Sequence, residues 1–264
     1  MSSWFDLVEI IVGVAIGLAV GWIIGKKSGR RSAINASDMA VAASAPEALY
    51  EIDEMEISVD FDENGSGMFS RSEAGIVPRF AMAELIIPYR FSVTPQGKLE
   101  PPEVRGLDSS SVRWESKLIE PTRIIGSIIL RGPFSESQKL AGYTLRQRFE
   151  KGFFVDREQT RQAYKDSAMP REYVGVAATV PARTLRCRIA FPPSHHVLSE
   201  GPSPCAFIGE TEFPNEVETA RIASSFSVTE GTAILTVSNP RPGVRYAITW
   251  LAPAASTRVA ASRL

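Results

Sequence analysis

The chain has 264 residues, a hydrophobic content of 44%, a charged content of 22% and a net charge of −1. These values are ordinary for a globular protein that buries a real core. The charge stays close to neutral beyond residue 31, which argues against a nucleic-acid binder, because such proteins carry a clustered basic excess.

The chain begins with an apolar segment that predicts one transmembrane helix within residues 1–31. Residues 10–25 carry no charge, and extension back to Trp4 gives a stretch that spans about 33 Å as a helix. A bilayer core is about 30 Å thick, so this helix is long enough to cross it. The alternatives are a cleaved signal peptide and a buried core helix. The acids Asp6 and Glu9 before the apolar run argue against a signal peptide.

The charges that flank the apolar segment predict its orientation. The membrane-flank residues are all on the C-terminal side, and they are Lys26, Lys27, Arg30 and Arg31. Positive charge favours the cytoplasmic side of a membrane. We therefore expect a single-pass protein of the cell membrane, with its N-terminus outside and its C-terminal domain in the cytoplasm.

A glycine repeat in the same segment predicts helix association. Gly13, Gly17, Gly21 and Gly25 recur every four residues and form three overlapping G-x-x-x-G units. Glycine lets helix backbones approach closely in lipid, where packing rather than the hydrophobic effect drives association. The partners that we expect are the lipid bilayer and a second copy of the chain or another membrane helix. The alternative is that glycine is simply frequent in membrane helices.

The rest of the chain predicts a mainly β fold. Residues 32–50 form a linker rich in Ala and Ser, and residues 253–264 form a tail that we expect to be disordered. Between them, apolar and polar residues alternate with the period of strands that are buried on one face. The clearest alternations are at residues 55–61, 185–191 and 244–250.

Short strands separated by frequent turns are typical of an antiparallel β-sandwich. We expect residues 51–170 to form a β-rich domain with one short helix. Residues 171–252 resemble an immunoglobulin-like sandwich in architecture, with no family assigned from motifs. The soluble region is therefore predicted to be one elaborated sandwich or two sandwiches.

The predicted helix carries the one basic strip that we consider for ligand binding. Asp156 is a plausible N-cap, followed by Gln159 in a capping-box arrangement, and the helix would run from Arg157 to Asp166. Arg157, Arg161 and Lys165 would then share one face. This face could bind a cytoplasmic protein or an anionic ligand, and the alternative is an ordinary solvated surface.

Other polar clusters do not support a metal site or a catalytic site. Asp60, Asp62 and Asn64 resemble the start of a calcium loop, but Arg71 occupies the position that needs a carboxylate. His195-His196 lies between Cys187 and Cys205 without a zinc-binding spacing. No nucleophile elbow or nucleotide-binding loop occurs in the sequence. We therefore predict no catalytic residue, metal or cofactor.

The sequence thus favours a non-enzymatic, membrane-tethered module for protein interaction or assembly. The alternative is a ligand-sensing membrane effector, in which the transmembrane helix oligomerises and perturbs the membrane, a layout known among defence proteins. A membrane-bound enzyme is the least supported class, because no catalytic constellation is present.

Overall fold

The structure, a computed structural model, describes residues 48–107, 112–165, 171–195, 201–208 and 213–253. The prediction of a mainly β protein is confirmed. The described helices are α2 (Arg157–Ala163), α3 (Glu216–Ala223) and the 3-10 turn η1 (Pro193–His195). None of the helices in these ranges is long and apolar enough to cross a membrane. The predicted transmembrane segment lies outside the described residues, as do residues 32–47 of the linker and 254–264 of the tail.

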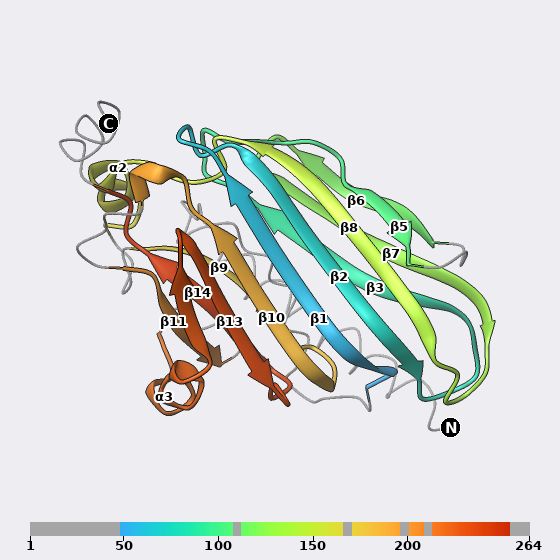
Figure 1. Ribbon diagram of the computed structural model, residues 1–264. Helices are drawn as coiled ribbons and strands as arrows, with labels where there is room; N and C mark the ends of the chain where they lie inside the picture. The colour runs from blue at the N-terminus through green and yellow to red at the C-terminus, as the bar shows by residue number, and fades with distance from the viewer. Residues whose placement is uncertain (1–47, 108–111, 166–170, 196–200, 209–212, 254–264) are drawn as a thin grey trace, which may run out of the picture. The chain divides into compact units, whose positions relative to one another are not determined.

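One large sheet forms the first layer, and its strands run side by side in Figure 1. Its order is β12-β13-β10-β1-β2-β8-β4, and β5 also pairs with β8. The strands are β1 (Tyr50–Phe61), β2 (Gly67–Pro78), β4 (Lys98–Leu99), β5 (Glu103–Gly106), β8 (Leu140–Glu150), β10 (Ala182–Ala190), β12 (Phe226–Thr229) and β13 (Thr232–Ser238).

Two three-stranded sheets make up the second layer, behind the large sheet in Figure 1. Their orders are β3-β7-β6 and β11-β14-β9. The strands are β3 (Met82–Ser92), β6 (Val112–Glu120), β7 (Arg123–Phe134), β9 (Glu172–Ala177), β11 (Ser203–Ile208) and β14 (Val244–Trp250).

Aromatic side chains hold the two layers together. The rings of Phe69 on β2 and Phe91 on β3 lie 4.5 Å apart between their centroids. At the other small sheet, Trp250 on β14 lies 6.0 Å from Phe61 on β1. One hydrophobic cluster contains all four of these residues. Both small sheets therefore pack on the same large sheet and share one continuous core.

The expectation of a purely antiparallel arrangement is wrong at the centre of the large sheet. β1 and β10 pair in parallel, with Ile57 opposite Cys187. A parallel pair needs a long crossover, and here the crossover contains every element from β2 to β9. This pairing was not predictable from alternation, because the two strand directions give the same pattern of burial.

The same pairing joins the two parts of the chain that were predicted as separate β domains. β1 belongs to the predicted domain 51–170 and β10 to the predicted domain 171–252, yet they are neighbours in one sheet. The boundary itself falls at residues 166–170, which lie outside the described residues. The domain division stays a prediction, while the shared sheet and core are observed.

Polar residues also enter the core. Arg71 and Glu73 lie on the inner face of β2, and both side chains are almost completely buried. The Arg71 guanidinium donates to Oε1 of Glu73 from Nη2 at 2.5 Å and from Nε at 3.2 Å. Each charge of a buried ion pair compensates the other, because either charge alone would be very unfavourable in the core.

We predict that Arg71→Met alone will destabilise the fold by about 3–5 kcal/mol, because it leaves the Glu73 carboxylate buried without its cation. The double variant Arg71→Met, Glu73→Leu should recover most of that loss. Chemical denaturation of both variants measures the free energy of unfolding. A double variant as unstable as the single one would show that the pair contributes more than mutual neutralisation.

Candidate functional site

The predicted association and membrane-flank residues lie outside the described residues. They are Gly13, Gly17, Gly21, Gly25, Lys26, Lys27, Arg30 and Arg31. Their roles stay predictions.

The predicted basic strip is not one continuous helix face. The N-cap is confirmed, because Oδ1 of Asp156 accepts hydrogen bonds from the backbone N–H groups of Glu158 and Gln159. The helix α2 ends at Ala163, however, so Lys165 lies beyond it. Nε of Arg157 donates to the carbonyl of Ala252 at 3.3 Å. One of the three cations thus serves to attach α2 to the segment that follows β14.

Arg161 is also engaged, since its Nη1 lies 3.0 Å from Oε1 of the exposed Glu158. A pair this exposed contributes little to stability, but it lowers the net charge of the surface. The observed geometry therefore gives no concentrated basic site at α2, although a role in binding stays a prediction for these residues.

A buried carboxyl group holds in place the two segments that flank α2. Glu172, at the start of β9, accepts a hydrogen bond from the backbone N–H of Phe154 at 3.1 Å and one from the Tyr164 hydroxyl at 3.4 Å. Burial raises the pKa of Glu172 to about 8, against the lowering effect of the Phe154 hydrogen bond. The side chain is therefore mostly neutral at pH 7 and ties α2 to the small sheet.

The polar clusters weighed as metal sites have structural roles. Oδ1 of Asp62 accepts from the backbone N–H groups of Asn64 and Ser66, which is the hydrogen bonding of a tight turn. His195 is buried and stacks on Phe191. Cys187 and Cys205 are both free and buried. Among the described residues, no group of His, Cys, Asp or Glu is placed to hold a metal ion.

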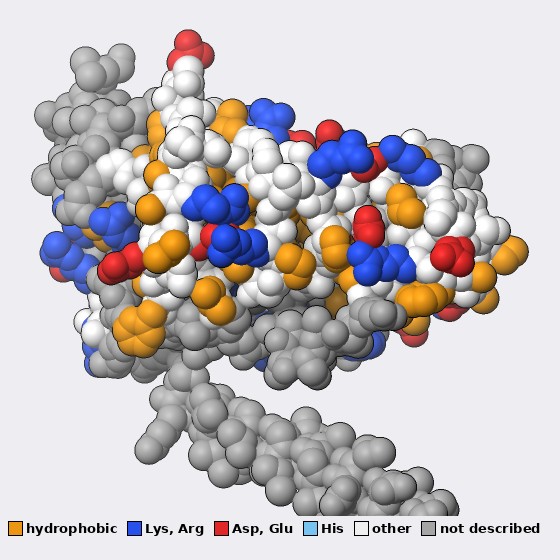
Figure 2. Space-filling model, turned by 90° about the horizontal axis from the view of Figure 1, so that it is seen from below, with side chains coloured by type: hydrophobic (Ala, Val, Ile, Leu, Met, Phe, Trp, Pro, Cys, Tyr) orange, Lys and Arg blue, Asp and Glu red, His pale blue; other side chains and the backbone are white. Residues whose placement is uncertain are grey.

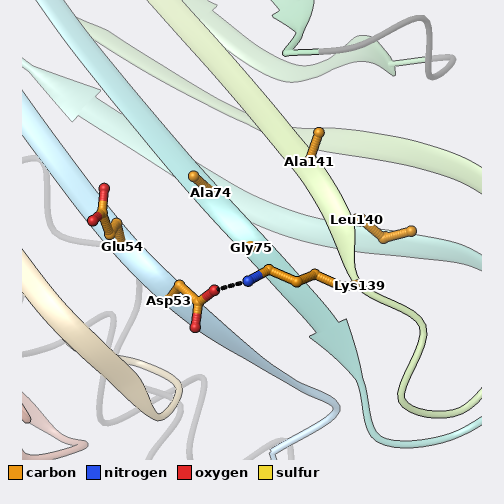
Figure 3. Close-up of a pocket in the computed structure, with 7 residues that line it drawn as sticks. All are labelled: Asp53, Glu54, Ala74, Gly75, Lys139, Leu140 and Ala141. Carbon is orange, nitrogen blue, oxygen red and sulfur yellow. Dashed lines mark ion pairs between the residues drawn. The ribbon is translucent and has the colours of Figure 1, made fainter.

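A shallow depression lies on the outer face of β1, β2 and β8, and Figure 3 shows its lining. Lys139 reaches across it, with its Nζ 2.5 Å from Oδ2 of Asp53. The hydrogen bond from Lys139 lowers the pKa of Asp53. Arg183 adds a weaker ion pair to the same carboxylate at 3.7 Å.

The depression has a cause in the backbone. Gly75 has a φ of +65°, and an added Cβ there would lie 2.3 Å from Oδ2 of Asp53. Gly142 on the neighbouring strand β8 has a φ of +114°. In β1 and β2, the alternation of inward-facing and outward-facing side chains shifts by one residue near Asp53 and Gly75. Asp53 therefore lies over the space that a side chain at Gly75 would fill. The Asp53–Lys139 ion pair therefore joins β1 to the segment before β8, and the depression is not a built ligand site.

More than half of the large exposed apolar side chains lie at one end of the described domain. We call the end where β1 begins the proximal end and the opposite end the distal end. The large apolar side chains left exposed among the described residues are Leu49, Phe80, Ile86, Leu107, Ile119, Ile208, Phe213, Val217 and Val228. The strand directions place Leu49, Phe80, Ile208, Phe213 and Val217 at the proximal end.

Figure 2 views the proximal end, with hydrophobic side chains scattered among basic ones. Val228 and Ile119 lie at the distal end. Val228 pairs with Ala233 and Ile119 pairs with Ile124, and both partners are near the distal ends of their strands. The most exposed members of the whole set are Val217 at 78% and Phe213 at 69%. They define what we call the α3 surface, together with Ile208 at the end of β11.

The α3 surface stands on a rigid base. Asn215 caps α3, because its side chain accepts from the backbone N–H of Glu218 at 2.8 Å. Oε1 of the buried Glu218 accepts from Arg221 at 2.6 Å and from the Tyr246 hydroxyl at 2.8 Å. The hydrogen bond from Arg221 lowers the pKa of Glu218, so the carboxylate stays charged and paired.

Sequence reasoning missed this surface because it did not predict α3. A usable pattern was present, since Asn215 followed three residues later by Glu218 is a helix-start signature. The exposure of Phe213 and Val217 was not predictable from sequence, because Phe and Val are among the residue types most often buried.

Comparisons with known proteins give the fold little context. No family model and no curated protein matches the sequence. Among solved structures, the chain is similar to an M1 zinc metallopeptidase from Deinococcus radiodurans at 9% identity and a TM-score of 0.35. The match covers 76% of this chain and 42% of that chain. A variant of an M1 zinc metallopeptidase from the same organism, bound to a Tyr-Ser-Ala substrate, matches at 9% identity and a TM-score of 0.35, over 75% of this chain and 42% of that one. The chain thus spans less than half the length of these proteins.

We predict that Glu172 makes the fold less stable as pH rises from about 4.5 towards about 8. These limits are the pKa values of the Glu172 carboxyl in the unfolded and the folded state. In that window the folded state keeps the proton that the unfolded state has lost. The free energy of unfolding should therefore fall by up to roughly 1.4 kcal/mol per pH unit. Glu172→Gln should remove this contribution in denaturation experiments across the same pH range.

The matched control is Glu158→Gln, which removes an exposed acid from the same region. This variant should keep the pH dependence of the unmodified chain. If Glu172→Gln and Glu158→Gln give the same dependence, then Glu172 does not hold its proton in the folded state.

Proposed function

We propose that the protein is a membrane-tethered module for protein interaction and assembly. In this proposal, residues 1–31 anchor the chain in the cell membrane and associate through the glycine face. The β domain is cytoplasmic and binds a protein partner through the α3 surface. The immunoglobulin-like character proposed for residues 171–252 provides the scaffold, since β9, β11 and β14 lie across the core from β10 and β13.

The observation that carries the proposal is the combination of exposure and rigidity at the α3 surface. Phe213 and Val217 are the most exposed large apolar side chains of the described domain. Protein interfaces are enriched in aromatic anchors, and such anchors bind best when they are held in place before binding. The Glu218 network supplies that support directly beneath α3.

The chemistry of the buried acids supports a binding role. Glu73 is paired with Arg71, Glu172 with Tyr164 and the Phe154 backbone, and Glu218 with Arg221 and Tyr246. Each of these groups is used to hold an element of the fold in position. They therefore support a rigid scaffold that presents a surface.

We predict that a photoreactive phenylalanine analogue placed at Phe213 in the full chain will crosslink to a single protein partner, which can be a second copy of the chain. Val217→Asp should reduce the crosslinked product by roughly tenfold, because a charge would be buried at the centre of the contact. Gel electrophoresis with mass spectrometry identifies and quantifies the product.

The matched controls use the distal end. The same analogue at Val228 should give no specific product, and Val228→Asp should leave the Phe213 product unchanged. Equal crosslinking from both positions, or no loss with Val217→Asp, would contradict the α3 surface as the binding site.

We predict that Gly17→Leu with Gly21→Leu will abolish crosslinked oligomers of the full chain in membranes, because leucine side chains hold helix backbones apart. The control places leucines on the opposite side of the helix, with Val12→Leu and Ala19→Leu, and it should keep the oligomers. Unchanged oligomers in the glycine variant would overturn the packing role of the glycines. If expression of the chain collapses membrane potential and the glycine variant prevents this, the effector alternative gains support.

A further inference from the structure

Two segments that each carry an exposed apolar side chain meet near the point where the described chain begins. Leu49 immediately precedes β1 and is 56% exposed, and Phe80 follows β2 and is 46% exposed. The backbone N–H of Arg79 donates to the carbonyl of Leu49 at 3.0 Å, which holds the two segments together. We call Leu49 and Phe80 with this connection the proximal corner.

The proximal corner is rigid on both sides. Arg79 donates to Oε1 of Glu51 from Nε at 3.0 Å and from Nη2 at 2.6 Å, a forked pair with both donors on one oxygen. The backbone N–H of Ser137 donates to the carbonyl of Pro78 at 2.9 Å and joins the β7–β8 connection to the same place. A shallow hollow beside Phe80 is lined by Glu51, Val77, Pro78, Arg79, Glu136 and Ser137.

The cations around the proximal corner already have acidic partners. Arg79 pairs with Glu51, and Lys139 pairs with Asp53 at 2.5 Å. Arg183 approaches the same Asp53 at 3.7 Å. Attraction to anionic groups is therefore largely neutralised, and the apolar side chains are the part of this surface that gains most from leaving water.

The predicted tether decides which surface these side chains meet. If the membrane helix ends near Gly25, residues 26–47 connect it to the proximal corner. A chain of 22 residues spans at most about 75 Å even when it is fully extended. In the proposal, this connection limits how far the proximal end can move from the bilayer, which raises the effective concentration of lipid for a weak contact.

We infer that the proximal corner is a lipid-contact site, in which Leu49 and Phe80 insert into the boundary between headgroups and acyl chains. This inference rests on the proposed membrane tether and adds the partner of this end of the domain. An aromatic and an aliphatic side chain on two joined segments at the end of the domain would bury apolar area in this boundary, as interfacial helices do with their apolar face.

The test uses the full chain in vesicles of phosphatidylcholine, with and without an anionic phospholipid. Single cysteines at positions 49 and 80 (Leu49→Cys and Phe80→Cys) carry the environment-sensitive dye NBD. The controls are Val228→Cys and Ile119→Cys at the distal end. Cys187 and Cys205 are buried, so the unmodified chain measures background labelling.

We expect blue-shifted dye emission at positions 49 and 80, and quenching by lipids that carry a nitroxide near the headgroup. Positions 119 and 228 should show neither effect. With the dye at position 49, Phe80→Asp should lower the quenched fraction by roughly tenfold, because a charge replaces the larger apolar contact. Quenching should be the same in neutral and anionic vesicles.

Flotation of the vesicles separates this inference from the proposed tether. A chain that floats with the vesicles but shows no more quenching at positions 49 and 80 than at 119 and 228 would overturn the lipid contact alone. Quenching that appears only with anionic lipid would overturn its apolar basis. A chain that does not float would overturn both the tether and the contact that depends on it.

Discussion

The parallel pairing of β1 with β10 is the constraint on which the rest of the structure depends. It joins the first described strand to one that follows after β9, and it places both at the centre of the large sheet. Because the large sheet is continuous, the two small sheets can each pack on part of it and still share one core. Ile57 and Cys187, which face each other across this pair, are both fully buried. Without the pairing, each half would have an open sheet edge and a much smaller core.

Sequence patterns predicted the strands better than their arrangement. Alternation at residues 55–61 and 185–191 corresponds to β1 and β10, because a strand that is buried on one face must repeat every two residues. The alternation at residues 244–250 also corresponds to a strand, β14, but the expectation of one buried face is wrong there, because all seven residues of β14 are buried. Strand direction and order leave no such trace. The change of face near Asp53 was also hidden, because it depends on positive φ values at Gly75 and Gly142 on the neighbouring strands. A glycine in a strand has several possible causes, and the sequence does not choose among them.

The candidate site was less predictable than the fold, for a physical reason. Arg71 entered the sequence analysis only as a mismatch in a calcium-loop pattern, and Glu73, Glu172 and Glu218 did not enter it, yet all four are buried and hold elements together. A charge in an inward position is stable only when its partner is present, and the partner often comes from a distant strand, as Tyr246 does for Glu218. The predicted basic strip failed as a continuous face for a local reason, since α2 ends at Ala163 before it reaches Lys165.

The strand directions place the first and last described strands so that the two ends of the domain differ. β1 begins at the proximal end, whereas β14 ends at the distal end near the aromatic cluster of Phe61 and Trp250. The described chain therefore starts and finishes at opposite ends of the domain. A tether that precedes β1 can restrict only the proximal end, which is also where α3 and most of the strongly exposed apolar side chains lie. The parallel pair at the centre of the sheet thus has a second consequence: it places the starts of β1 and β10 at the same end of the domain, so the segments around Leu49 and Phe80 lie at the end where β10 begins.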